Sequence, residues 1–177
     1  MIRLFVAVDC PKISLPELYS LAADTPSHIT LRFLGDVHAS LVGDLGRALE
    51  RTLQGAHGGM LEIKGLGAFP RPSRPRVLWA GLVDATGFLN DLHRRVSEAV
   101  EGLGMPPEDH PFHPHVTLAR IKGWAKEDIA RRAIEAHRSE SFAKFTVPAV
   151  LLVQSTLTRE GAIHRPLLSV PLAPVPS

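Results

Sequence analysis

The pattern His-x-Thr-Leu occurs twice in this chain, and it limits the possible fold and chemistry more than any other feature. Motif I is His28–Leu31 and motif II is His115–Leu118, which begin 87 residues apart in a chain of 177. Random ordering of the same residues gives roughly 0.05 copies of such a pattern. A single strand histidine held by a local hydrogen bond would be ordinary, but two matching copies favour a shared functional site.

Each motif predicts a strand with one chemical face and one core face. Residues two apart on a strand point to the same side, so the histidine and threonine of each motif should project together. The aliphatic second residue, Ile29 or Val116, and the final leucine should point the other way, into a core. One such strand can form half of an active site, and two can complete it.

Bulk properties limit the class of protein. A chain of 177 residues can form one large domain or two small fused lobes, and its formal charge of +2 does not by itself indicate a nucleic-acid partner. Cys10 is the only cysteine, which excludes an internal disulfide and fits a reducing cytoplasm. Apolar runs are too short to cross a membrane, and the first nine residues lack a signal-peptide cleavage pattern. We therefore expect a cytoplasmic protein without a membrane partner.

Hydrophobic periodicity predicts a mixture of strands and helices. The expected strands cover residues 4–8, 27–34, 60–69, 77–83, 114–121, 145–158 and 166–172, and the expected helices cover 40–53, 88–103 and 127–138. A further short helix should open near Ser14 and stop at Asp24-Thr25-Pro26, and the proline-rich residues 70–76 should form a loop. Strands and helices do not alternate strictly, which favours an α+β fold with mainly antiparallel sheet. Similar blocks around the two motifs indicate two related lobes that face each other.

The paired motifs suit chemistry at a phosphodiester. Two imidazoles can share acid and base roles near neutral pH, because the ordinary histidine pKa is about 6.5. One would deprotonate the attacking hydroxyl and the other would protonate the leaving oxygen, while Thr30 and Thr117 hold the non-bridging oxygens. Such a mechanism requires no metal, cofactor or covalent nucleophile.

The residues around both motifs resemble the paired signatures of the two-histidine (2H) phosphoesterases. These are His-Ile-Thr-Leu-Arg-Phe-Leu-Gly at 28–35 and Phe-His-Pro-His-Val-Thr-Leu-Ala-Arg at 112–120. The most similar branch is the RNA 2',3'-cyclic phosphodiesterases, historically called 2'-5' RNA ligases. Residues 3–8 and 77–81 also resemble that branch.

The resemblance implies a fold, a reaction and a substrate. The fold would be bilobal and pseudo-symmetric, with flanking helices, a cleft between the lobes, and residues 1–177 as a single domain. The reaction would open a terminal 2',3'-cyclic phosphate to a 2'-phosphate, with His28 protonating the 3'-oxygen, His115 activating water and Thr30 and Thr117 on the phosphate. Its reverse would give 2'-5' RNA ligation. The partner would be an RNA end, for example of a tRNA fragment, bound by a monomer.

Two arginines are further candidates for phosphate binding. Arg32 lies four residues after His28, so on a regular strand it would share the same face; an ordinary surface arginine is the alternative. Arg120 lies where relatives often have a phosphate-contacting arginine, but an ideal strand aims it away from His115, so a bulge or strand end is required. His113 next to His115 suggests a metal site, but no suitable further ligands follow, and no metal is expected.

Several alternatives remain open from the sequence. Arg71, Arg74 and Arg76 could attract RNA phosphates or be solvated, and Trp79 and Phe112 could stack a base or pack in the core. His164 lies where relatives often have an aromatic residue and receives no role. The protein could also act on small cyclic nucleotides or an ADP-ribose cyclic phosphate, or bind RNA without catalysis.

Overall fold

The computed structural model describes residues 1–21 and 27–177, and it confirms the α+β class. Its elements are β1 (Ile2–Asp9), α1 (Pro16–Leu21), β2 (His28–Val37), η1 (Ala39–Leu41), α2 (Val42–Leu53), β3 (Met60–Arg71), β4 (Arg74–Val83), α3 (Phe88–Glu101), β5 (Val116–Arg120), α4 (Trp124–Ala136), β6 (Ser141–Thr146), β7 (Ala149–Thr158) and β8 (Gly161–Pro171). None of the described helices is both long and apolar enough to span a membrane.

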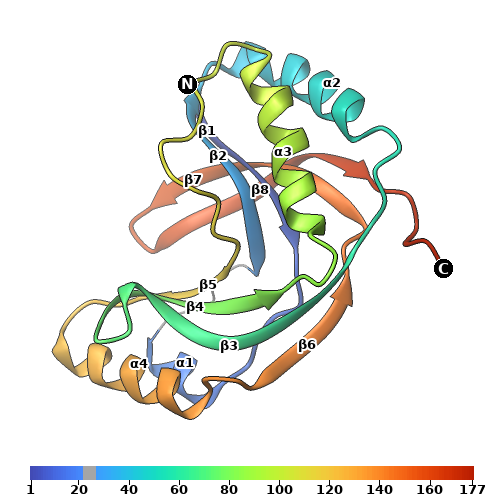
Figure 1. Ribbon diagram of the computed structural model, residues 1–177. Coiled ribbons are helices and arrows are strands. Elements are labelled where there is room, and N and C mark those ends of the chain that lie inside the picture. The colour runs from blue at the N-terminus through green and yellow to red at the C-terminus, as the bar shows by residue number, and fades with distance from the viewer. Residues whose placement is uncertain (22–26) are drawn as a thin grey trace.

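The eight described strands form an antiparallel sheet that is narrow at its centre. Their order is β6-β3-β4-β5-β2-β1-β7-β8, and the two central strands pair through Ile29 and Val116 alone. This division gives a first lobe of β1, β2, β7 and β8 and a second lobe of β3 to β6 (Figure 1). Each lobe places its motif strand at the centre of the sheet.

The helices complete the two lobes, but not in chain order. α2 and α3 pack on the first lobe, and α4 packs on β3 and β4 of the second. α1 follows β1 of the first lobe but packs against α4 and β5 in the second. The chain therefore crosses between the lobes, and the described part of each lobe has four strands and two α-helices around an approximate twofold axis through β2 and β5.

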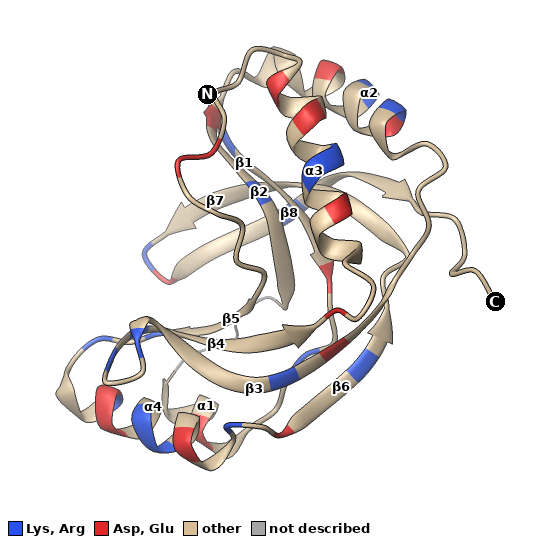
Figure 2. Cartoon of the chain, in the orientation of Figure 1, with Lys and Arg blue, Asp and Glu red and all other residues tan. Residues whose placement is uncertain are grey.

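Periodic leucines bury one face of α2, as their spacing predicts. Leu45, Leu49 and Leu53 are buried against the sheet and α3, and they belong to one continuous hydrophobic cluster. Figure 2 shows acidic and basic residues interspersed along the outer surfaces of α2, α3 and α4. Neither sign of charge collects on these helices.

The first turn of α3 is capped by a side chain from the preceding loop. Asp84 accepts hydrogen bonds from the backbone N–H groups of Phe88 (3.1 Å, to Oδ1) and Leu89 (2.8 Å, to Oδ2). Gly87 adopts a φ of 73° just before the helix, a conformation that glycine tolerates without strain. The carboxylate thus satisfies two N–H groups that have no partner within the helix.

Two predicted elements differ from the structure, and one predicted boundary is not tested by it. In place of the expected loop at 70–76, β3 and β4 continue to a tight hairpin turn at Pro72 and Ser73. Proline is tolerated near the end of a strand because its missing N–H removes only one hydrogen bond of the sheet. The expected strand at 145–158 is two strands, since Pro148 lacks an N–H and the chain there leaves the second lobe for the first. The predicted helix stop at Asp24-Thr25-Pro26 lies outside the described residues.

Candidate active site

The two motifs lie side by side at the junction of the lobes. Ile29 pairs with Val116 in antiparallel register, and both side chains are buried. Continuing that register by one residue places the histidine of each motif beside the threonine of the other. All four polar side chains then lie on the face opposite the core, as strand alternation predicts.

The final leucine of each motif is the extra residue of a β-bulge. The flanking pairs are Ala7–Thr30 and Val6–Arg32 around Leu31, and Trp79–Thr117 and Leu78–Ala119 around Leu118. Both leucines are buried. A bulge inserts one residue into one strand and so changes the face to which the following side chains point. The fourth position of the motif therefore has a structural role that is the same in both lobes.

The bulge at Leu31 makes the prediction that Arg32 shares the strand face of His28 wrong. Arg32 is only 4% exposed and points away from His28 toward α3 and the segment that follows it. Its guanidinium forms ion pairs with Glu101 (3.4 Å) and Glu108 (3.2 Å). The same-face expectation assumed a regular strand, and β2 is not regular at this point.

The two strands have different residues at the position five residues after the motif histidine, which the bulges make equivalent. In β2 the position belongs to Phe33, which is 48% exposed and stacks on Phe5 at 6.5 Å, with the Arg3 guanidinium 4.8 Å from its ring centre. In β5 it belongs to Arg120, which is exposed and has no ion pair with a described residue. The irregularity that the prediction for Arg120 required is the bulge at Leu118.

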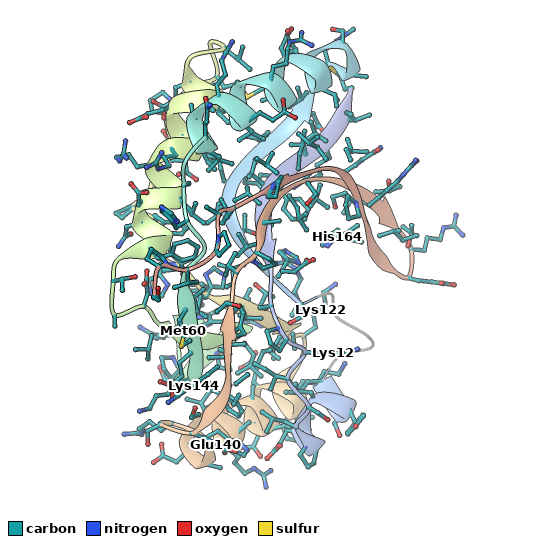
Figure 3. The ribbon with its side chains drawn as sticks, turned by 90° about the vertical axis from the view of Figure 1, so that its right-hand side faces the viewer. Lys12, Met60, Lys122, Glu140, Lys144 and His164 are labelled. Carbon is teal, nitrogen blue, oxygen red and sulfur yellow. The ribbon has the colours of Figure 1, made fainter. Side chains whose placement is uncertain are left out.

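The ring of His28 lies in an aromatic environment. It contacts Phe5 at 5.0 Å and His164 at 5.1 Å between ring centres. Burial lowers the pKa of His28 to about 4, and charge repulsion from His164 and His115 contributes. Burial also lowers the pKa of His164, whose Nδ1 is buried without a hydrogen-bond partner in the described chain. Figure 3 shows His164 in the first lobe, above Lys122 and Lys12.

The ring of His115 is held in one tautomer. Its Nδ1–H donates a hydrogen bond of 2.7 Å to the carbonyl oxygen of His113, so the neutral ring carries its lone pair on Nε2. Phe69 and Trp79 border the ring at 5.0 and 6.4 Å. Burial lowers the pKa of His115, the hydrogen bond to His113 opposes this change, and charge repulsion from His113 adds to it. The Nε2 atom can therefore accept a proton near neutral pH.

The two threonines complete a small group of donors. Thr30 and Thr117 are half-buried, and neither hydroxyl hydrogen-bonds to residues 1–21 or 27–177. Two such hydroxyls beside two imidazoles can bind and transform an anionic phosphoryl group. Across the described residues, no group of three or more His, Cys, Asp or Glu side chains could hold a metal ion.

Some contacts in this region could not be anticipated from the sequence. Phe5 and Phe69 border the two histidines, although neither was singled out, because only strand pairing shows which face they occupy. Phe112, a candidate for base stacking, stacks instead on His93 at 4.2 Å. Arg76, one of the three arginines that could attract RNA phosphates, forms an ion pair with Glu127 of α4 at 2.9 Å. The repeated motif gave no signal for these contacts.

Comparison with known proteins identifies relatives that match most of the chain. A family model described as the 2'-5' RNA ligase superfamily matches residues 15–159. An Aeropyrum pernix protein named RNA 2',3'-cyclic phosphodiesterase is 37% identical over 150 residues, which cover 85% of this chain and 84% of that protein. An Archaeoglobus fulgidus protein of the same name is 37% identical over 180 residues, covering 93% and 97%.

Solved structures give the same result. The protein TT0787 from Thermus thermophilus superimposes with a TM-score of 0.74 at 27% identity, over 97% of this chain and 98% of that one. E. coli LigT complexed with 3'-AMP superimposes with a TM-score of 0.71 at 26% identity, with the same coverage. The family match includes both motifs and confirms the resemblance that their sequences indicate. The chain belongs to the 2'-5' RNA ligase superfamily.

Proposed function

We propose that this protein hydrolyses the 2',3'-cyclic phosphate at the end of an RNA to a 2'-phosphate. The observation that carries this proposal is the pairing of Ile29 with Val116, which sets two imidazoles and two hydroxyls on one face. The Aeropyrum and Archaeoglobus relatives bear the name of this activity. E. coli LigT has also been crystallised with 3'-AMP and with phosphate, ligands that resemble parts of such a substrate.

The reaction forms one bond to phosphorus and breaks another. Water attacks the phosphorus, and His115 Nε2 takes the proton that the water loses. The bond from phosphorus to the 3'-oxygen breaks, and His28 gives that oxygen a proton. Thr30 and Thr117 donate hydrogen bonds to the non-bridging oxygens, and Arg120 offers positive charge at the end of β5. The products are a 2'-phosphate and a 3'-hydroxyl.

The protonation states fit these roles once the substrate is bound. The lowered pKa values keep both rings neutral near pH 7 in the free protein, and the bond to His113 leaves His115 ready to act as the base. A phosphodiester anion beside His28 favours its charged form and so raises its pKa. The family resemblance assigns His28 as the acid, and the fixed tautomer of His115 supports that division.

The proposal includes the form of the enzyme and the range of its substrates. One chain supplies both motifs, so residues 1–177 acting as a single domain in a monomer would suffice. RNA ends such as those of tRNA fragments carry the required cyclic phosphate. Reversal of the same steps would join a 5'-hydroxyl RNA end to the cyclic phosphate and give a 2'-5' linkage.

Product analysis tests the reaction and the residues together. An RNA oligonucleotide ending in a 2',3'-cyclic phosphate should yield only the 2'-phosphate product in the presence of EDTA. His28→Ala and His115→Ala should each lower turnover by about 100-fold or more, since each removes a general acid or base. His57→Ala is a matched control, because His57 contacts the carbonyl of Pro174 near the C-terminus and lies outside the motifs.

Other outcomes would assign a different function. Full activity in either motif variant would exclude two-histidine catalysis. Faster turnover of a mononucleotide or an ADP-ribose cyclic phosphate than of the oligonucleotide would indicate a small-molecule substrate. Tight RNA binding with no turnover of any cyclic phosphate would indicate a binding module.

A further inference from the structure

One segment connects the first lobe to the strand that carries motif II. It runs from the end of α3 at residue 102 to His115, and Figure 1 shows it descending from the upper lobe to β5 in the lower one. The central strands of the sheet pair through a single residue from each lobe. The position of His115 relative to His28 therefore depends strongly on how this crossover segment is held.

Arg32 holds the start of the crossover segment. It lies on β2, and its Nη2 donates a 2.6 Å hydrogen bond to the carbonyl oxygen of Pro106. Its Nη1 forms ion pairs with Glu108 of the segment at 3.2 Å and Glu101 at the end of α3 at 3.4 Å. The same Nη1 donates a hydrogen bond to Ser97. The buried guanidinium of Arg32 thus binds groups of the first lobe and of the crossover segment, and it faces away from His28.

The contacts continue along the segment toward the motif. Glu108 also accepts a 2.6 Å hydrogen bond from Nε2 of His93 on α3. The ring of Phe112 stacks on His93 with centres 4.2 Å apart and planes only 2° from parallel. Phe112 is three residues before His115, so residues 106, 108 and 112 are all held against the first lobe.

We propose that Arg32 is a positioning residue that fixes His115 of the second lobe relative to His28 of the first. Arg32 acts through Pro106 and Glu108, and it does not touch the substrate. The proposal rests on the function proposed above. A displacement of about 1 Å at a catalytic group can cost on the order of 100-fold in rate, so a small movement of the crossover segment should be measurable.

Three variants separate positioning from phosphate binding. Arg32→Met removes the charge and the fork but keeps most of the bulk, and Glu108→Gln removes the partner carboxylate at a side chain that is 32% exposed. Arg94→Met is the control, because Arg94 is an exposed α3 arginine that forms ion pairs only with Asp91 and Glu98 of its own helix among the described residues. Each protein is assayed on the cyclic-phosphate oligonucleotide and for competitive inhibition by inorganic phosphate.

The expected pattern is a loss of kcat without a loss of phosphate affinity. Arg32→Met and Glu108→Gln should each lower kcat by roughly 10- to 100-fold, with the inhibition constant of phosphate unchanged within about twofold. The double variant should be no slower than the slower single variant, because both remove the same connection. Arg94→Met should match the wild type.

Two results would overturn the proposal. Weaker phosphate inhibition in Arg32→Met with no effect of Glu108→Gln would make Arg32 a phosphate ligand. Wild-type kcat in both variants would show that the connection serves folding alone. If Arg32→Met does not fold, Glu108→Gln and Arg32→Lys decide between these outcomes.

The assay also separates this proposal from the proposed function. If the wild type turns over no cyclic phosphate, the proposed function is wrong. The positioning role of Arg32 is then tested by nitrogen NMR of the His115 ring. Loss of the Nδ1–H bond to His113 in folded Arg32→Met or Glu108→Gln would support positioning. Its retention in both would overturn it.

Discussion

His28 and His115 occupy the same position in two matching motifs but have different surroundings. The His28 ring lies against Phe5 and His164, and no hydrogen bond to a described residue fixes its tautomer. The His115 ring donates from Nδ1 to the carbonyl of His113. Neutral imidazole is favoured at both sites by burial, but only His115 has a defined atom for accepting a proton. The nearly symmetric sequence therefore forms an asymmetric pair.

The lowered pKa of His28 predicts a loss of stability in acid. The pKa is about 4 in the folded protein and about 6.5 in the unfolded chain, so the unfolded chain binds more protons between these values. The contribution of His28 to the free energy of unfolding should be largest above pH 6.5 and should fall as the pH falls toward 4. His28 should account for about 2 kcal/mol of the loss between pH 7.5 and 4.5.

Urea denaturation of the wild type and His28→Asn at these two pH values measures that contribution. The variant should lose less stability than the wild type on acidification, because its residue 28 does not titrate. An equal loss in both proteins would contradict the lowered pKa. His115 and His164 also have lowered pKa values, so a residual loss is expected in the variant.

At the scale of the elements, the bulges in β2 and β5 determine which residues reach the site. Leu31 and Leu118 enter the core together with Ile29 and Val116, and the strand then continues with its faces exchanged. Arg32 consequently belongs to the packing of α3 and the crossover segment. The same geometry in both lobes shows that the motif encodes a bulged strand as well as a set of polar side chains.

The cap of α3 predicts a local effect on stability. Asp84→Ala should lower the free energy of unfolding by about 1–2 kcal/mol, because two N–H groups of the first turn lose their acceptor. Asp84→Asn should retain only part of that stability, because its amide has one acceptor oxygen for the two N–H groups. Chemical denaturation measures the difference, and turnover well below the unfolding transition should stay at the wild-type level. A neutral Asp84→Ala would mean that water replaces the carboxylate at no cost.

At the scale of the whole molecule, the site exists only where the lobes meet. Each lobe contributes one motif, and the order of the described elements takes the chain between lobes six times: after β1, α1, α2, β4 and α3, and at Pro148. A phosphate bound by Thr30 and Thr117 would contact both lobes at once. Binding would therefore stabilise the entire fold and not a single element.

This arrangement predicts that inorganic phosphate raises the melting temperature. The gain should correspond to roughly 2.7 kcal/mol at a concentration 100 times the dissociation constant. Thr30→Val and Thr117→Val should each reduce the gain, since valine preserves the shape and removes the hydroxyl donor. Sodium chloride at matched ionic strength is the control for general salt effects. Equal gains in the wild type and both variants would exclude the threonines as phosphate donors.

Local patterns in the sequence determined much of this protein. The leucine spacing of α2, the alternation in the two motif strands and the paired signature were sufficient to predict the α+β class, the family and the strand face that carries His28, Thr30, His115 and Thr117. These features depend on residues close together in the chain. Periodicity and short motifs report them directly.

Only the tertiary structure decided the features that depend on pairing between distant segments. The pairing of β1 with β2 makes Leu31 the extra residue of a bulge, and Arg32 therefore points toward α3. The curvature and pairing of β8 bring His164 to His28, although 136 residues separate them in sequence. A strand residue reaches one face or the other according to the register of its neighbours, and that register is fixed by contacts between segments far apart in the chain.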